Sequence, residues 1–341
     1  GLMDLSLKPI SGRAFLAYPE MLDFLLLEIT ERFFIDVKNI KNSDSDYSEK
    51  EISIFPHSSE PLLFGNLLYI PQWNEKRNPY WAATVLEAPA LLGFSSIKQA
   101  ALSLRNTQRN WGSYQYKLFR RAALIVESLP YINPKPRSFP YLIPESPMGL
   151  FTLVKKELIL CSAKTSSPLA AGCLTFVEDK IEPPSRAYLK FQEALTRLYS
   201  AKGSIPQKNE RCLDLGACPG GWTWVLRQLG CEVLAVDRTA LDEKLMKDPK
   251  VRFIKHDAFT LPLEELGPFD WIFSDVICYP ERLLEWVKKI LASGITKKMI
   301  CTIKLQGDID WQIIDTFAEI PHSFVQHLCY NKHELTWFYC E

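Results

Sequence analysis

Six residues in the middle of the chain, Gly216-Ala217-Cys218-Pro219-Gly220-Gly221, have the composition of a ligand-binding turn. They follow the apolar run RCLDL and precede GWTWVLRQL, a pattern typical of a helix. Glycines allow the backbone to approach a ligand closely, and the first N–H groups of a helix point toward it. An ordinary strand-to-helix turn has the same composition, so the turn predicts a ligand only together with other residues.

The spacing of these glycines separates ligand classes. A dinucleotide fingerprint needs G-x-G-x-x-G and a phosphate-binding loop needs G-K-[ST], and the spacing G-x-x-x-G-G fits neither. Asp237 ends the next apolar run, EVLAVD, where a carboxylate accepts hydrogen bonds from the two ribose hydroxyls of a nucleoside. A nucleoside bound without a pyrophosphate loop indicates S-adenosyl-L-methionine. Taken alone, Asp237 also fits a helix cap or a surface acid.

Three more polar residues end apolar runs farther along the chain. Asp257, in VRFIKHD, is placed to reach an adenine amino group or lies in a surface turn. Asp275, in DWIFSDV, would lie over the reacting group. It is followed neither by Pro-Pro-Tyr nor by Pro-Cys, which favours oxygen over an amine or a carbon as the acceptor. Lys304 ends KMICTIK, where desolvation and a neighbouring cation would lower its pKa and allow it to act as a base; a lysine extending off the sheet edge is the alternative.

The elements that must position these residues alternate between strands and helices. An amphipathic helix is predicted over Ser185–Tyr199, with Ser185 as its N-cap. Strands and helices then alternate until SFVQHLCY and LTWFYCE, which are predicted to close the chain as a strand pair. Parallel strands covered by helices on both faces, with an antiparallel edge, define a Rossmann-like α/β domain whose ligands bind at the carboxyl ends of the strands.

The first half of the chain has the mixed pattern of an α+β region. A short strand AFLAY, a helix over PEMLDFLLLEITERFF and short strands IDVKNI and ISIF are predicted before residue 57. A hairpin is predicted over Leu150–Ala163, and the proline-rich stretch Pro130–Pro147 is predicted to be a loop. RRAALIVESL, residues 120–129, fits both a helix and a strand.

A run of basic residues without any acid crosses this region: Lys98, Arg105, Arg109, Lys117, Arg120 and Arg121. Trp111, Tyr114, Tyr116 and Phe119 are interleaved with them. Cations that meet phosphates and aromatic faces that stack on bases suit a nucleic-acid surface. A solvated basic helix face with its aromatic residues in the core fits the same pattern equally well.

Composition limits the class of protein. The 341 residues carry 40 Lys+Arg and 40 Asp+Glu, so the chain is neutral overall and long enough for two or three domains. No apolar run reaches the roughly 18 residues of a membrane span, and no signal-peptide pattern is visible at the start. The nine cysteines form no C-x-x-C pair, which favours neither a zinc site nor a disulfide framework. A cytoplasmic protein without a bound metal is therefore expected, with a monomer favoured.

Taken together, PSRAYLK, DLGACPGGWT, the acids at Asp237 and Asp257, SDV and IKLQ resemble the motifs of the FtsJ-like ribose 2′-O-methyltransferases, and in particular the ribosomal RNA large-subunit methyltransferase M family. The resemblance covers residues 184–341. It implies a catalytic tetrad formed by Lys190, Asp275, Lys304 and Glu334. It also implies cofactor contacts at Ser185, Gly216, Cys218, Pro219, Gly220, Gly221, Trp222, Asp237, Asp257 and Asp275.

The resemblance also implies a role for each member of the tetrad. Lys304 would be the general base that removes the proton of a ribose 2′-hydroxyl, a weak acid and poor nucleophile. Lys190 and Asp275 would hold the charge state and orientation of Lys304, and Glu334 would position Lys190 or the hydroxyl.

The domain layout and substrate follow from the same resemblance. It implies a ferredoxin-like domain (1–80), a THUMP-like RNA-binding domain (81–165), a linker (166–184) and the methyltransferase domain (185–341). The implied substrate is RNA, a cytidine of large-subunit rRNA. A non-catalytic RNA-binding or ribosome-assembly factor on the same scaffold is the alternative. The glycine spacing argues against an NAD-dependent oxidoreductase.

Overall fold

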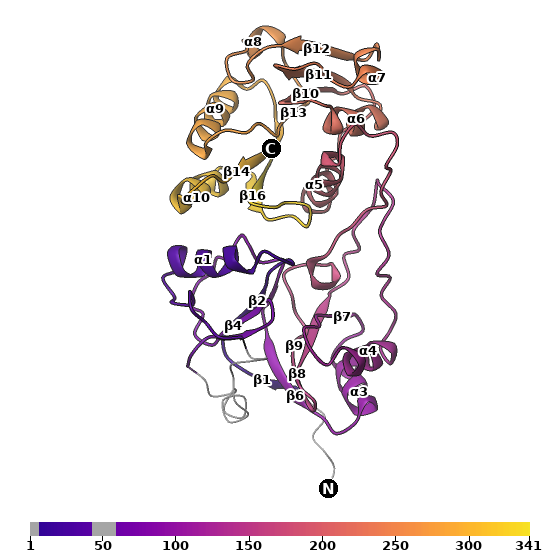
Figure 1. Ribbon diagram of the computed structural model, residues 1–341, viewed down its shortest axis with the longest axis vertical. Helices are drawn as coiled ribbons and strands as arrows, with labels where there is room; N and C mark the ends of the chain where they lie inside the picture. The colour runs from indigo at the N-terminus through magenta and orange to yellow at the C-terminus, as the bar shows by residue number, and fades with distance from the viewer. Residues whose placement is uncertain (1–6, 43–58) are drawn as a thin grey trace. The chain divides into compact units, whose positions relative to one another are not determined.

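The computed structural model describes residues 7–42 and 59–341, which form two compact units (Figure 1). Unit 1 comprises the described residues up to 135 together with 143–174, and unit 2 comprises residues 136–142 and 175–341. The segment 136–142 belongs to unit 2 because it pairs with the chain that leaves unit 1. Arg137 N–H donates to Thr175 O (2.8 Å), and Val177 N–H donates to Arg137 O (2.9 Å).

Unit 1 contains two sheets. The four-stranded sheet is antiparallel and has the order β3-β4-β2-β5, with β2 (Arg13–Leu16), β3 (Leu62–Phe64), β4 (Leu67–Ile70) and β5 (Thr84–Leu86). The five-stranded sheet has the order β1-β6-β9-β8-β7, with β1 (Lys8–Pro9), β6 (Pro89–Gly93), β7 (Trp111–Ser113), β8 (Gly149–Lys155) and β9 (Leu158–Ser162). The helices of this unit are α1 (Leu22–Arg32), α3 (Ile97–Thr107), α4 (Phe119–Glu127) and the short 3-10 helix η2 (Ala170–Gly172).

The strands of the five-stranded sheet are apolar on both faces because each face is covered. Ala90 and Leu92 on β6 pack in a cluster with side chains of α3 and α4. Leu91, between them, points to the other face and packs in a cluster with Phe64 and Tyr69 of the four-stranded sheet. Because successive side chains of a strand point to opposite faces, β6 contributes to the apolar core on each side of the sheet.

The predictions for this unit have different outcomes. The hairpin over Leu150–Ala163 is confirmed as β8 and β9, and RRAALIVESL lies in the helix α4. The strand predicted for IDVKNI is wrong: Phe34 adopts a φ of 59° and Ile35 N–H donates to Ile29 O, so this chain caps α1. The ISIF strand lies outside the described residues. The ferredoxin-like and THUMP-like assignments stay predictions.

Unit 2 is built on one seven-stranded sheet of order β12-β11-β10-β13-β14-β16-β15. The pairings from β12 to β14 are parallel, and those of β16 with β14 and β15 are antiparallel. The strands are β10 (Arg211–Leu215), β11 (Glu232–Asp237), β12 (Val251–Lys255), β13 (Trp271–Ser274), β14 (Lys298–Lys304), β15 (Ser323–Gln326) and β16 (Glu334–Cys340). The helices are α5 (Ala187–Lys202), α6 (Gly221–Gln228), α7 (Glu243–Met246), α8 (Leu263–Leu266), α9 (Pro280–Ser293) and α10 (Trp311–Glu319).

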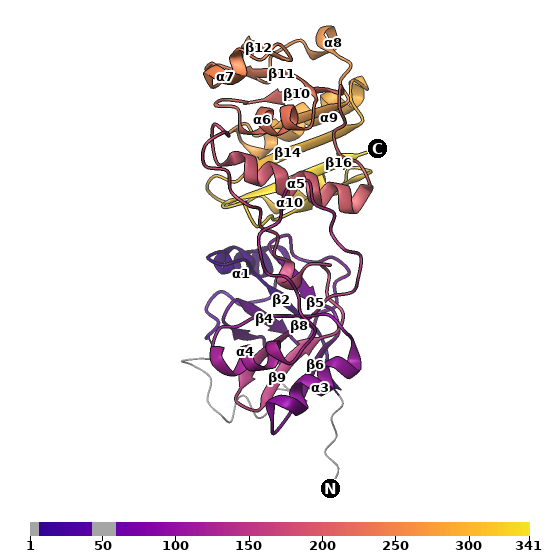
Figure 2. The ribbon, with the colours of Figure 1, turned by 90° about the vertical axis from the view of Figure 1, so that its right-hand side faces the viewer.

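Helices cover both faces of this sheet. Figures 1 and 2 show α5 and α6 over one face and α9 and α10 over the other. The predicted Rossmann-like alternation and the closing antiparallel pair are confirmed. The predicted N-cap is wrong by one residue, because α5 begins at Ala187 with Arg186 as its N-cap, and Ser185 Oγ accepts only from Ala187 N–H (3.3 Å).

The topology brings distant residues to one edge of the sheet. The strand order reverses between β10 and β13, which is where ligands bind in open parallel sheets. The antiparallel β16 starts where β14 ends, so Glu334 lies opposite Lys304 in the register. No helix among the described residues is both long enough and apolar enough to cross a membrane.

Candidate active site

The glycine turn between β10 and α6 has a backbone that suits glycine. Gly216 has a φ of 71° and Gly220 a φ of 120°. A Cβ on Gly216 would lie 2.8 Å from Cγ2 of Val276, in the loop that follows β13. The N–H groups of Gly216 and Ala217 donate to Val236 O (2.9 and 3.1 Å). The turn is therefore packed between the ends of β11 and β13, with no room for a side chain at Gly216.

Asp237 at the end of β11 holds the turn in place. Its Oδ2 accepts from Cys218 N–H (2.9 Å), and its Oδ1 accepts from Thr239 N–H (3.2 Å). A carboxylate offers about four acceptor positions, so each oxygen of Asp237 can accept a further hydrogen bond. Asp237 can thus organise the turn and still bind a ligand.

A cavity of about 560 Å³ lies at the carboxyl ends of the parallel strands. It is lined by Gly216, Cys218, Asp237, Arg238, His256, Asp257, Ala258, Phe259, Asp275, Val276, Ile277, Cys278, Arg282 and Lys304. Its volume lies in the range of cofactor and small-ligand sites. Six of the residues predicted from the sequence therefore share one cavity: Gly216, Cys218, Asp237, Asp257, Asp275 and Lys304.

The other predicted cofactor contacts do not line this cavity. Ser185, Pro219, Gly220 and Gly221 lie next to the turn; a Cβ on Gly221 would be 2.8 Å from Ser185 Oγ. Trp222 is buried, and its ring stacks on Phe191 with centroids 4.5 Å apart. For Trp222 the structure indicates a packing role beside the turn.

Asp257 is already engaged inside the cavity. Its Oδ1 lies 3.1 Å from Arg238 Nη2, and its Oδ2 lies 3.7 Å from Arg282 Nη2. Burial opposes ionisation, but the hydrogen bond from Thr260 and the two guanidinium groups hold the pKa of Asp257 below its ordinary value. The carboxylate is therefore ionised and shared between two exposed arginines.

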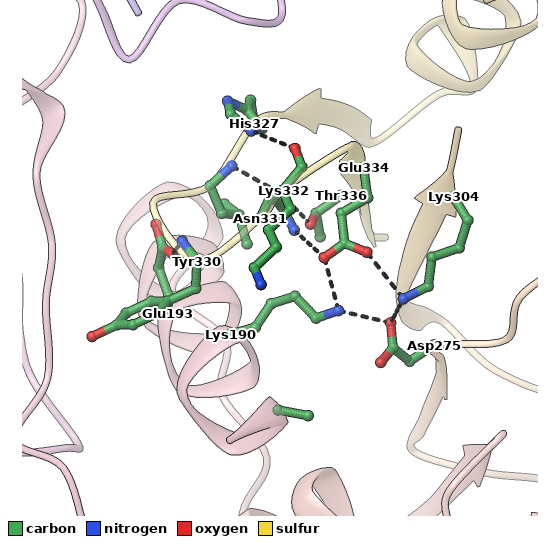
Figure 3. Close-up of polar contacts among 12 residues, drawn as sticks. Lys190, Glu193, Asp275, Lys304, His327, Tyr330, Asn331, Lys332, Glu334 and Thr336 are labelled. Carbon is green, nitrogen blue, oxygen red and sulfur yellow. Dashed lines mark hydrogen bonds and ion pairs between the residues drawn. The ribbon is translucent and has the colours of Figure 1, made fainter. Parts of the chain in front are cut away.

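The four residues of the predicted tetrad form a closed ring of charges (Figure 3). Lys190 Nζ lies 2.9 Å from Asp275 Oδ1 and 3.0 Å from Glu334 Oε1. Lys304 Nζ lies 2.9 Å from both Asp275 Oδ1 and Glu334 Oε2. Each lysine contacts both carboxylates, so positive and negative groups alternate around the ring.

Four different elements supply this ring. Lys190 comes from α5, Asp275 directly follows β13, Lys304 ends β14 and Glu334 begins β16. Their side chains are only 11–19% exposed, so solvent screens these charges less than it would at the surface. Of the four, Asp275 and Lys304 also line the cavity, so the charge ring borders it.

The charge state of the ring differs from the sequence prediction. Burial alone would lower the pKa of Lys304, but Asp275 and Glu334 outweigh burial and raise it above its ordinary value. Burial opposes ionisation of both acids, and the two lysines nevertheless hold the pKa of Asp275 and of Glu334 below the ordinary values. The expected lowering of the Lys304 pKa is therefore wrong for this arrangement, because two carboxylates contact the amine.

Two buried polar residues beside the ring were not identified from the sequence. Glu193 on α5 is fully buried and pairs with Arg197 (2.7 Å), and Asn331 precedes β16 and contacts Glu334. A signal for Glu193 exists in the sequence: Lys190, Glu193 and Arg197 recur at helical spacing, so their side chains lie on one side of the predicted helix. Asn331 has no such signal, because it lies in an irregular loop.

The predicted RNA-binding residues lie in unit 1, around α3 and α4. Lys98, Arg105, Arg109 and Arg120 are exposed, and Lys117 and Arg121 are partly buried. Arg121 Nε donates to Lys156 O, and its guanidinium lies 5.3 Å from the ring centre of Phe94. Arg121 therefore helps to hold unit 1 together, whereas the four exposed residues are open to solvent.

The interleaved aromatic residues divide between core and surface. Trp111 is buried and donates from Nε1 to Leu104 O (2.8 Å). Tyr114 accepts from Asn66 N–H (2.6 Å) and stacks on Tyr116. Phe119 is 58% exposed. The core alternative thus holds for Trp111, and Phe119 is the aromatic side chain of this stretch that faces solvent.

Comparison with known proteins assigns the class of unit 2. Residues 183–308 match the FtsJ-like methyltransferase family model, which spans the glycine turn, the cavity and three of the four ring residues. Residues 183–308 are therefore an FtsJ-like methyltransferase domain, and the resemblance seen in the sequence motifs is confirmed for this part of the chain.

Curated relatives are named ribosomal RNA large subunit methyltransferase M. The protein of that name from Alkalilimnicola ehrlichii is 37% identical over 134 residues, which are 38% of this chain and 36% of the relative. The one from Thauera aminoaromatica is 29% identical over 202 residues, 53% of this chain and 55% of the relative. This chain thus spans about half or less of the length of these relatives.

Among solved structures, this chain is similar to the 1,6-didemethyltoxoflavin-N1-methyltransferase of Burkholderia thailandensis, crystallised with S-adenosylhomocysteine. The TM-score is 0.33 at 17% identity, covering 46% of this chain and 80% of that chain.

Proposed function

We propose that this protein transfers a methyl group from S-adenosyl-L-methionine to a ribose 2′-hydroxyl of RNA. The observation that carries the proposal is that Lys304 and Asp275 belong both to the charge ring and to the wall of the cavity. An acid–base group and a ligand site of nucleoside size therefore meet at one point. The FtsJ-like family match supports the same reaction class.

The residues present fit this cofactor. Asp237 has acceptor capacity left for ribose hydroxyls, and Gly216 of the turn lines the same cavity. Asp257, paired with Arg238 and Arg282, would recognise the base. When bound, the cofactor supplies a methyl group on a positively charged sulfur, so that a C–O bond forms as the C–S bond breaks.

Lys304 would take the proton of the attacking hydroxyl at its Nζ. A ribose hydroxyl is a weak nucleophile until its proton is removed, and an amine within hydrogen-bond reach supplies that function. In the ring described above Lys304 is an ammonium group, because Asp275 and Glu334 raise its pKa. It must lose a proton to solvent before it acts, so the rate of methyl transfer should rise with pH.

The other ring members would set the position and charge of Lys304. Asp275 and Glu334 contact its Nζ from two elements and fix the direction of the amine. Lys190 shares the same two carboxylates and limits the negative charge that Lys304 experiences. This division of roles explains why two lysines and two acids occupy one small site.

We further propose that the substrate is large-subunit rRNA and that the methylated residue is a cytidine. The names of the curated relatives support rRNA. The exposed basic residues Lys98, Arg105, Arg109 and Arg120 support a polyanionic partner for unit 1. In the domain layout we propose, the ferredoxin-like and THUMP-like regions bind this RNA and residues 185–341 modify it.

The test is to map methylation in rRNA from cells that lack and then regain this protein. A 2′-O-methyl group blocks alkaline cleavage of the adjacent phosphodiester, so each modified ribose appears as a gap in the hydrolysis ladder. A gap that returns with the protein supports the proposal. An unchanged ladder, together with no binding of S-adenosyl-L-methionine in calorimetry, would favour the non-catalytic RNA-binding factor.

A further inference from the structure

Asn331 contacts Glu334 of the charge ring, and the sequence motifs assign no role to Asn331. It is 3% exposed, and its Nδ2 donates to Glu334 Oε1 (3.3 Å). Its Oδ1 accepts from Leu328 N–H (2.8 Å) and from the hydroxyl of Thr336 (3.0 Å). Figure 3 shows Asn331 beside Glu334, on the side away from Lys304.

The chemistry of these partners fixes the orientation of the amide. A backbone N–H can only donate, so the oxygen of Asn331 must face Leu328 and its NH₂ group must face Glu334. Glu334 Oε1 then receives hydrogen bonds from Asn331 and Lys190, which leaves Oε2 for Lys304. The amide thus helps to fix the rotation of the Glu334 carboxylate, so that one oxygen faces Lys190 and the other faces Lys304.

The loop that carries Asn331 is itself held by α5. The two carboxylate oxygens of Glu193 accept from Cys329 N–H and Tyr330 N–H, both at 2.8 Å. The Nε2 of His327 lies 3.3 Å from Lys332 O and closes the same loop. α5 also carries Lys190, so one helix supports both a ring lysine and the loop that orients its acid.

We propose that Asn331 is a positioning residue of the active site, which holds the Glu334 carboxylate so that it bridges Lys190 and Lys304. This inference rests on the proposed methyl transfer. Asn331 does not line the cavity, so its loss should change the chemical step and leave cofactor affinity unaltered.

The first test is Asn331→Asp, which keeps the shape and the acceptor for Leu328 N–H but replaces the donor with an oxygen. When ionised, that oxygen would repel Glu334 Oε1; when protonated, it can donate as the amide does. We expect kcat to fall about tenfold at high pH, in line with the loss of a hydrogen bond to a charged group. The rise of kcat with pH should also move to higher pH, because the added anion holds the Lys304 proton, with the KM for S-adenosyl-L-methionine unchanged.

A matched pair of variants separates positioning from packing. Thr336→Val removes the hydroxyl that bonds Asn331, whereas Thr302→Val makes the same change at the residue paired with Thr336 on β14. Both threonines are buried, and the Thr302 hydroxyl has no hydrogen-bond partner among the described residues. Thr336→Val should lower kcat severalfold, Thr336→Ser should restore it, and Thr302→Val should leave it at the wild-type value.

Titration of the Lys304 Nζ group by NMR tests the inference without catalysis. Asn331→Asp adds an anion beside Glu334, so Lys304 should titrate at higher pH than in wild type. Unchanged titration curves and an unchanged pH profile would overturn the positioning role, as would equal effects of Thr336→Val and Thr302→Val. Should Asn331→Asp not fold, the threonine pair decides. Should wild type lack methyl transfer, the proposed function fails while the titration still tests the positioning.

Discussion

Replacing Glu334 with Gln removes one of the two anions that hold the Lys304 proton. Glu334 Oε2 lies 2.9 Å from Lys304 Nζ, and the two side chains are 13% and 19% exposed. At that distance two unit charges interact by ~6 kcal/mol for an effective dielectric constant of about 20, before desolvation and screening are subtracted. Opposite charges at such range shift a pKa by about 1–3 units, or about 1.4–4 kcal/mol. We therefore expect the Lys304 pKa to fall by that amount in Glu334→Gln.

The assay is the pH dependence of kcat for methyl transfer to RNA under saturating cofactor. If neutral Lys304 is the base, the rising limb of the profile should move to lower pH by about 1–3 units in Glu334→Gln. The plateau should fall about tenfold or more because the amine is held less firmly. Glu285→Gln, on the exposed face of α9, is the control and should leave the profile unchanged. A limb at the wild-type pH, or at higher pH, would refute the assigned electrostatics.

Three further outcomes follow from the structure. Gly216→Ala should cost roughly 1–2 kcal/mol of stability for its φ of 71°. It should also weaken cofactor binding, because the Cβ would displace Val276, which lines the cavity. Gly294→Ala, with a φ of 69° and open space, should cost only stability in urea unfolding. Arg120→Glu should weaken RNA binding, most at low salt, without changing cofactor affinity in calorimetry. Burial lowers the pKa of His327 from 6.5 to about 4. Between pH 6.5 and about 4 the imidazole is therefore protonated in the unfolded state but neutral in the folded state, so the free energy of unfolding should fall by roughly 3 kcal/mol as the pH drops through this range. His327→Asn should lose this pH dependence.

Much of unit 2 could be predicted because its local patterns agree with its topology. The apolar runs RCLDL and EVLAVD match β10 and β11 residue for residue. Strand ends place Asp237, Asp275 and Lys304 at one edge once the sheet is parallel, so their presence in one cavity follows from connectivity.

The predictions that were wrong depend on contacts between residues that the local sequence pattern does not specify. Asp275 and Glu334 together outweigh burial and raise the Lys304 pKa, and Glu334 is 30 residues away in sequence and reaches Lys304 through the β14–β16 register. The strand predicted for IDVKNI does not form, because this segment begins by capping α1 through the hydrogen bond from Ile35 N–H to Ile29 O. The alternation of apolar and polar residues does not reveal such a cap. The burial of Asn331 could not be predicted, because a polar residue in a loop has no periodicity that marks it as buried.

If Lys304 is the base, its removal should stop the chemical step without preventing cofactor binding. Methyl transfer to large-subunit rRNA should be measured for Lys304→Ala and for Lys298→Ala, at the other end of the same strand, with S-adenosyl-L-methionine binding measured for each by calorimetry. We expect that Lys304→Ala still binds the cofactor but loses about 10²–10⁴-fold in kcat, while Lys298→Ala retains its activity. Methyl transfer by Lys304→Ala at the wild-type rate would contradict the assignment of Lys304 as the base.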